Sequence, residues 1–203
     1  MKDRFLIVVE GIADETFIRQ YLYHLFGQKV PDNFILRTNG KDNLKYSVAI
    51  NRMRSMTDQG GINLVIFDAD NNFETRRASI LEWKKQNGLE FELFLLPNNQ
   101  DKGELEDLLE NIINPNNRPI LDCWEHYEKE LVTLDIPGRT PPPLTIPAKK
   151  TKIYGYLEAL LGTSESDKKK IKEREREYHN ALHWNLDAEY LLPLKEFLEK
   201  WIG

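Results

Sequence analysis

Cysteine is almost absent from this sequence, since Cys123 is the single one among 203 residues. An internal disulfide and a cysteine-rich zinc site are therefore excluded, which is typical of proteins from a reducing compartment. No apolar run is long enough to span a membrane, and the run at residues 5–9 is too short for the core of a signal peptide. We expect a soluble, cytoplasmic protein with no membrane partner.

An excess of positive charge is also absent. The chain has 28 Lys and Arg against 33 Asp and Glu, and the net charge of −5 does not mark the whole chain as a nucleic-acid binder. The basic residues are unevenly distributed, because nine of them stand beside only five acidic residues between Lys149 and Arg176. This distribution predicts a basic segment beside an acidic body.

The first half of the chain alternates short apolar runs with amphipathic runs, four times over. The apolar runs lie at 5–10, 34–37, 63–67 and 90–96, and the amphipathic runs at 14–26, 41–56, 73–87 and 103–113. The runs "FLIVV" and "NLVIF" are apolar throughout, as in strands that are covered on both faces. The pattern predicts an α/β, Rossmann-like fold with a four-stranded parallel sheet flanked by helices.

The pattern changes after residue 114, where helices are predicted at 121–132, 151–161 and 187–202. Five prolines between Pro137 and Pro147 exclude regular structure from the connection at 135–148. We therefore expect an α/β core at 1–114 and a helical C-terminal extension at 115–203 that packs on it. The charged run "SESDKKKIKEREREYHN" has almost no core-forming residues, which predicts a solvated helix or a mobile segment.

Carboxylates follow two of the predicted strands. Glu10 closes the first strand, and Asp68 and Asp70 close the third, where they point the same way if the chain stays extended. Ligands of parallel sheets gather at the carboxyl ends of the strands, and neighbouring strands are only about 4.8 Å apart. If these strands are adjacent, the three carboxylates converge and repel one another. Proteins usually offset such repulsion by binding a divalent cation such as Mg²⁺ between the carboxylates.

Further acidic residues stand where helices are predicted to begin. Asp14 follows Glu10 by four positions, and Glu104, Glu106 and Asp107 follow the fourth strand. Acidic residues favour helix N-termini because they cap backbone N–H groups and complement the helix dipole. That explanation covers these residues, but it does not cover the three carboxylates that directly follow strands.

"VVEGIADETFI" followed by "VIFDAD" resembles the TOPRIM superfamily, whose signature is a glutamate after the first strand and a D-x-D after a later one. The spacing of Glu10 and Asp14 and the block "LPNNQDKGELEDLL" resemble the branch that contains the OLD-family nucleases and small bacterial TOPRIM-like proteins. The resemblance covers roughly residues 4–113. It implies a TOPRIM fold and Mg²⁺- or Mn²⁺-dependent phosphoryl transfer on DNA or RNA, most simply a nuclease.

The resemblance also implies roles for particular residues. Asp68 and Asp70 would hold the cation, and Asp14 and Glu106 would help to hold a second one. Lys152 would neutralise the charge on the scissile phosphate, and Lys149 is the alternative candidate for this role. The metal ligands implied are Glu10, Asp14, Asp68, Asp70 and Glu106, and the catalytic residues are Glu10, as ligand or general acid/base, and Lys152.

The ATPase domain that accompanies many OLD nucleases is missing, and no G-x-x-x-x-G-K-[ST] motif occurs. A non-catalytic module of TOPRIM fold that binds metal or nucleic acid beside a partner ATPase is therefore the alternative. A structural protein with degenerate acidic residues is a third.

Two further motifs suggest other interpretations of the sequence. Asp68 and Asp70 also resemble the nucleophile motif of haloacid-dehalogenase-type phosphatases, but Asn72 stands where that motif has Thr or Val. His179 and His183 stand at i and i+4, as in some zinc sites, but without the H-E-x-x-H pattern or an evident third ligand.

Overall fold

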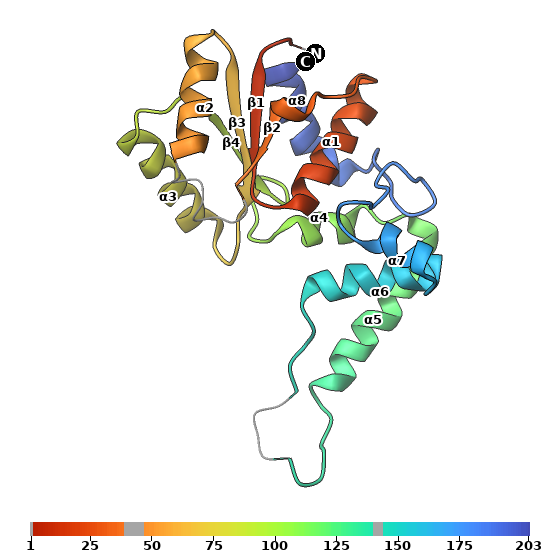
Figure 1. Ribbon diagram of the computed structural model, residues 1–203. Helices are drawn as coiled ribbons and strands as arrows, with labels where there is room; N and C mark the ends of the chain where they lie inside the picture. The colour runs from red at the N-terminus through yellow and green to blue at the C-terminus, as the bar shows by residue number, and fades with distance from the viewer. Residues whose placement is uncertain (1, 39–46, 140–143) are drawn as a thin grey trace.

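The computed structural model describes residues 2–38, 47–139 and 144–203. Its centre is a four-stranded sheet in the order β2-β1-β3-β4, in which all neighbouring strands are parallel (Figure 1). The strands are β1 (Phe5–Val9), β2 (Ile35–Arg37), β3 (Ile62–Asp68) and β4 (Glu92–Leu96). The predicted α/β class and the parallel sheet are confirmed, and each predicted strand is present with ends shifted by up to two residues.

Helices follow the strands as the periodicity predicts. They are α1 (Ile12–Phe26), α2 (Ser47–Asp58), α3 (Phe73–Gln86), α4 (Leu105–Asn111), α5 (Arg118–Leu131), α6 (Lys149–Leu161), α7 (Glu165–Ile171) and α8 (Leu192–Ile202). The beginning of the helix predicted at 41–56 lies outside the described residues. Within the described ranges, no helix combines the length and the apolar character that a membrane crossing requires.

Each face of the sheet packs against a different set of helices. Strand residues such as Leu6 and Val8 share a cluster with Met53 of α2 and Ile80 of α3. The opposite face packs in a larger cluster, whose helical members include Phe17 of α1, Leu108 of α4, Ile153 of α6 and Leu198 of α8. Complete burial of β1, with every side chain at 0 to 1% exposure, explains why "FLIVV" has no polar alternation.

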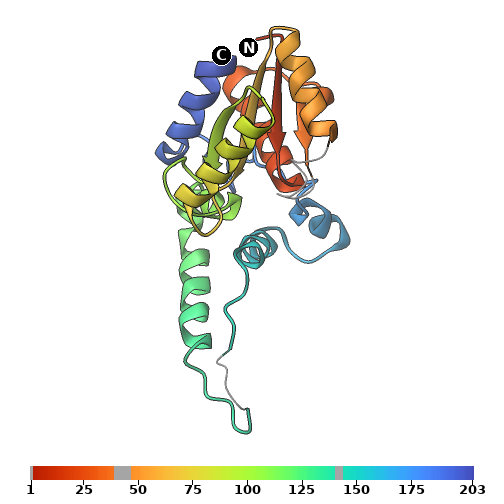
Figure 2. The same ribbon diagram turned by 90° about the vertical axis from the view of Figure 1, so that its left-hand side faces the viewer.

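The chain after residue 114 contributes to that same larger cluster, through Leu121, Ile153 and Leu198 among others. The helix α8 packs against β4, where the rings of Phe197 and Phe94 are 5.3 Å apart, and its end lies next to the start of the chain, where the Lys2 N–H donates to the Ile202 carbonyl at 2.9 Å. The helix α5 extends away from the sheet, whereas α6 lies across the end of the sheet and places Ile153 in the larger cluster (Figures 1 and 2). The carboxyl ends of the strands point toward α4, α6 and α7.

The charged run at 164–180 contributes buried side chains that its composition does not predict. Only α7 is helical in it, and Ile171, Arg176 and Tyr178 are buried. The Arg176 guanidinium donates from Nε and Nη2 to the Ile171 carbonyl, at 3.3 and 3.0 Å, and lies over the rings of Tyr154 and Tyr178. The predicted solvated helix is present as α7, in which Ile171 is the only buried residue, but the prediction missed the part of the segment where an arginine and a tyrosine supply the buried contacts that apolar residues usually supply.

We expect Arg176→Ala to lower the free energy of unfolding by about 2–3 kcal/mol, because it removes buried packing and leaves the Ile171 carbonyl without its donor. Chemical denaturation monitored by tryptophan fluorescence measures the change. The control is Arg174→Ala, an exposed arginine of the same segment, which should change stability by less than about 0.5 kcal/mol. Equal effects of the two substitutions would contradict a structural role for Arg176.

Candidate functional site

The carboxyl edge of the sheet brings acidic residues from three segments together. Glu10 directly follows β1 and Asp68 is the last residue of β3, and these two strands are neighbours in the register Val9↔Ile66. Asp68 Oδ1 accepts a hydrogen bond from the Leu105 N–H at 3.0 Å, which ties the end of β3 to the first residue of α4. The adjacency on which the predicted convergence depended is therefore present.

The backbone conformation of Asp70 at this edge differs from the extended one that was predicted. It has a left-handed backbone with φ of 54°, so the chain is no longer extended after Asp68 and the two side chains do not project from one strand. Aspartate tolerates this conformation better than most residues. The Asp70 carbonyl accepts from the Gly103 N–H at 2.8 Å, which joins the loop after β3 to the loop after β4.

Gly103 is required at that junction on two counts. Its φ of 144° is unfavourable for other residues, and a Cβ there would lie 2.5 Å from Asp107 Oδ2. Asp107 in turn accepts from the Glu104 N–H at 2.8 Å and so fixes the start of α4. The acidic residues of α4 are thereby held next to the end of β3.

Arg76, which is not among the site residues predicted from the sequence, connects the ends of β1 and β3. Its Nη2 donates to Glu10 Oε1 at 2.5 Å, its Nε donates to the Asp68 carbonyl at 3.2 Å, and the same Nε lies 3.6 Å from Asp70 Oδ2. The Arg76 side chain is only 16% exposed. The available signal was a basic residue in the first turn of the helix that follows the D-x-D motif.

Mutual repulsion among the carboxylates shows how closely they gather. Burial, and to a smaller extent the negative charges of Asp14, Glu10, Glu106 and Glu104, raise the pKa of Asp68 to about 9. Burial also raises the pKa of Glu10 and Glu106, and for Glu10 it outweighs the opposing effect of Arg76. Asp68 is therefore the centre of an acidic cluster, which we define as Glu10, Asp14, Asp68, Asp70, Glu104 and Glu106.

Asp14 has a structural role as well as a place in the acidic cluster. Its Oδ2 accepts from the Gly11 N–H at 2.7 Å and caps the start of α1, and the residue is 7% exposed. A Cβ on Gly11 would lie 3.1 Å from Asp14 Oδ2, so glycine permits this close approach. The capping role that was expected for acidic residues at helix starts is confirmed for Asp14 and Asp107.

Carboxylate oxygens are the ligands that Mg²⁺ and Mn²⁺ prefer, so the donor chemistry of the acidic cluster fits these ions. In the described part of the chain, however, no three carboxylate, imidazole or thiol side chains are close enough together to hold a metal ion. Arg76 supplies positive charge to Glu10 and Asp70 instead. A cation at this edge therefore requires Arg76 to release Glu10 and the carboxylates to draw together.

Lys152 of α6 pairs with Glu110, which lies one helical turn after Glu106 along α4. Its Nζ is 3.2 Å from Glu110 Oε2 and 3.3 Å from Glu128 Oε2, and its side chain is 10% exposed. The alternative candidate, Lys149, pairs with Asp107 at 2.6 Å. Both predicted lysines are thus near the acidic residues of α4, and each is engaged in an ion pair.

The two histidines at i and i+4 have separate packing roles. His183 is buried, and its carbonyl accepts from the Tyr156 hydroxyl at 2.6 Å. His179 Nδ1 lies 2.9 Å from Gln20 Oε1 and helps to hold the C-terminal segment against α1. Neither belongs to a group that could bind zinc within the described residues.

Residues 4–203 match the model of a protein family described as DUF3226, protein of unknown function. The chain belongs to the DUF3226 family. No curated protein and no solved structure matches it. The α/β core, the acidic cluster and the C-terminal helices all lie within the segment that matches DUF3226.

The elevated pKa of Asp68 predicts that the DUF3226 chain is less stable at high pH. Between the ordinary value of 3.8 and the folded value of about 9, the folded state holds more protons than the unfolded state, so the free energy of unfolding falls as pH rises. Asp68→Asn removes the ionisable group and retains an oxygen that can accept from Leu105. We expect it to raise the melting temperature at pH 8 by about 2–4 °C, equivalent to roughly 1 kcal/mol.

Thermal unfolding of the metal-free protein between pH 5 and pH 8 measures this effect. Asp58→Asn at the exposed end of α2 removes one carboxylate outside the acidic cluster and should leave the pH dependence unchanged. The electrostatic account is wrong if Asp68→Asn and the wild type lose stability equally across this range.

Proposed function

We propose that this protein catalyses metal-dependent phosphoryl transfer on a nucleic acid, most simply as a TOPRIM/OLD-like nuclease that uses Mg²⁺ or Mn²⁺. The observation that carries the proposal is the meeting of carboxylates from β1, β3 and the start of α4 around Asp68, at the edge of a parallel sheet where ligands bind. Carboxylates that only cap helices would not need to converge on a residue that ends a strand.

In this proposal Asp68 and Asp70 hold the cation, and Glu10 is a further ligand or the general acid/base. Asp14 and Glu106 help to hold a second cation. When bound, the cations stabilise the charge that develops on the attacking and leaving oxygens. Arg76 holds Glu10 and Asp70 in place without metal and, once it is displaced from Glu10, supplies a guanidinium for a phosphate oxygen.

A cytoplasmic location belongs to the same proposal. Its alternative is a non-catalytic module of TOPRIM fold that binds metal or nucleic acid beside a partner ATPase. The ion pairs of Lys152 with Glu110 and Glu128 favour this alternative, because they leave that ammonium less available to a phosphate. The two functions differ in turnover and not in their ligands.

Cleavage of plasmid and single-stranded DNA and of RNA in Mg²⁺ and in Mn²⁺ tests the proposal. We expect the wild type to cleave, and we expect Asp68→Asn/Asp70→Asn to lose at least about 100-fold in rate because both cation ligands are weakened. The matched control is Asp58→Asn, purified by the same procedure. Equal cleavage by the double variant would contradict the assignment, whereas saturable metal binding without cleavage would favour the binding module.

Metal binding itself can be followed by thermal unfolding. We expect Mg²⁺ or Mn²⁺ to raise the melting temperature of the wild type, because the cation neutralises the acidic cluster only in the folded state. The Asp68→Asn/Asp70→Asn variant should show little of this shift, and Asp58→Asn should show all of it. A shift of equal size in all three proteins would exclude the acidic cluster as the metal site.

The role of Lys152 requires a separate test. If it neutralises the scissile phosphate, Lys152→Ala should lower turnover by about 100-fold and leave the metal-dependent rise in melting temperature intact. The same change should cost about 2–4 kcal/mol of stability, because Glu110 and Glu128 lose their shared cation. Assays are therefore run well below the melting temperature of the variant, and unchanged turnover there would leave Lys152 a purely structural role.

A further inference from the structure

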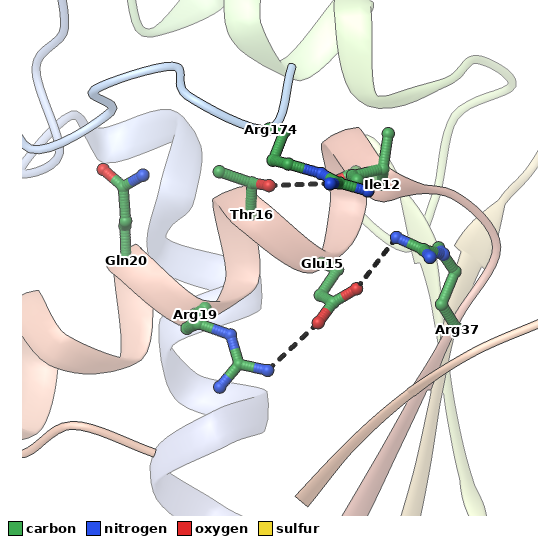
Figure 3. Close-up of a pocket in the computed structure, with 7 residues that line it drawn as sticks. All are labelled: Ile12, Glu15, Thr16, Arg19, Gln20, Arg37 and Arg174. Carbon is green, nitrogen blue, oxygen red and sulfur yellow. Dashed lines mark hydrogen bonds and ion pairs between the residues drawn. The ribbon is translucent and has the colours of Figure 1, made fainter. Parts of the chain in front are cut away.

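A groove runs along the outer side of α1, next to the acidic cluster. It consists of two adjoining cavities of about 420 and 520 Å³, which share Arg19 and Gln20 among their lining residues. Figure 3 shows the first of these cavities, between α1, the end of β2 and the loop that carries Arg174. We call the two cavities together the α1 groove.

Positive charge dominates the α1 groove although the whole chain is acidic. Its lining includes two carboxylates, Glu15 and Asp32, and four permanent cations: Arg19, Lys29, Arg37 and Arg174. Glu15 pairs with both Arg19, at 3.1 Å, and Arg37, at 3.3 Å, so one carboxylate is shared by two guanidinium groups. An anionic ligand would complete the neutralisation of this lining.

Two of the cations are available to such a ligand. Arg174 and Lys29 are exposed, and no described residue forms a hydrogen bond or an ion pair with the side chain of either. In Figure 3 the Arg174 side chain reaches from its loop toward Ile12 and Thr16 of α1. The cavity is therefore bordered by a guanidinium that the fold itself does not use.

The loop that carries Arg174 is held against α1 by specific contacts. Gln20 Nε2 donates to the Arg176 carbonyl at 2.7 Å, and Gln20 Oε1 accepts from the His179 N–H at 3.1 Å. Arg176 is itself anchored by its bonds to Ile171. The position of Arg174 beside α1 is thus fixed by buried and backbone contacts on its C-terminal side.

The α1 groove starts where the acidic cluster ends. Ile12, which lines the first cavity, follows Glu10 by two residues, and Arg37 pairs with Val9 at the carboxyl end of β2. The second cavity continues along α1 to Tyr23, whose side chain is 49% exposed. Guanidinium groups bind phosphates, and an exposed aromatic ring offers a surface on which a base can stack.

We propose that the α1 groove binds the phosphodiester backbone of a single nucleic-acid strand and leads it to the acidic cluster. This inference rests on the proposed function, because it names the substrate and its path to that site. A single strand fits the lining better than a duplex does, since a base can reach Tyr23 only when it is unpaired. The arginines also offset the repulsion that the acidic cluster exerts on a phosphate backbone.

Fluorescence anisotropy with a short labelled single-stranded DNA or RNA, in EDTA and at several salt concentrations, tests the groove without cleavage. We expect Lys29→Ala/Arg174→Ala to weaken binding by about tenfold or more and to reduce the salt slope by about 1.4, for two lost phosphate contacts at roughly 0.7 each. The matched control is Arg54→Ala/Lys85→Ala, two exposed cations on α2 and α3, which cover the other face of the sheet. This control should bind like the wild type.

Four results would overturn the inference. One is equal weakening in both double variants, which would indicate diffuse attraction to positive charge. Another is equal or tighter binding of a duplex of the same sequence. The third is displacement of the labelled strand by polyglutamate as effectively as by unlabelled strand, which would indicate an acidic protein partner. A wild type that does not bind the strand in EDTA or in Mg²⁺ would overturn it as well.

The Asp68→Asn/Asp70→Asn variant separates this inference from the proposed function. It should bind the strand in EDTA at least as tightly as the wild type, because it removes negative charge beside the path of the strand. Binding that depends on the groove, without cleavage by the wild type, would retain the groove and reject the nuclease. Cleavage that is insensitive to Lys29→Ala/Arg174→Ala, with unchanged strand affinity, would retain the nuclease and reject the groove.

Discussion

The parallel pairing of β1 with β3 is the constraint on which the rest of the structure depends. Both strands are buried on both faces, and their parallel direction places Glu10 and Asp68 at the same edge of the sheet. An antiparallel pairing of the same two strands would separate these carboxylates by the length of a strand. The hydrophobic burial that stabilises the centre of the fold therefore also concentrates negative charge at one edge.

That concentration is unfavourable in isolation, and the surrounding structure limits its cost. Arg76 bridges the ends of β1 and β3, the Leu105 N–H binds Asp68, and the Gly11 N–H binds Asp14. Asp68 nevertheless has a pKa of about 9, so protonation relieves much of the remaining repulsion near neutral pH.

The C-terminal helices complete the environment of this edge. The larger hydrophobic cluster includes both β1 and α8, and α6 carries the two lysines that pair with acidic residues of α4. Arg176 and Gln20 hold the loop with Arg174 beside α1. The segment after residue 114 therefore adds positive charge beside α4 and α1 to the charge that Arg76 supplies at the acidic edge.

The sequence by itself determined the class of the fold and the ends of its strands. Apolar runs such as "FLIVV" can be buried only in a covered sheet, and the period of the following segments gave the helices to within a few residues. It also located Glu10 and Asp68, because a carboxylate directly after such a run must lie at the carboxyl edge. The proposed chemistry and the boundary at residue 114 stay predictions.

Tertiary structure alone decided which cations meet these carboxylates. The bond from Arg76 to Glu10 spans 66 residues and the pairing of Lys152 with Glu110 spans 42, and no periodicity encodes contacts of that range. The left-handed turn at Asp70 and the burial of Arg176 also escaped the sequence analysis, since each depends on partners supplied by another segment. A local sequence pattern indicates which residues of one element are buried, whereas the electrostatic partners of a residue depend on how all the elements pack together.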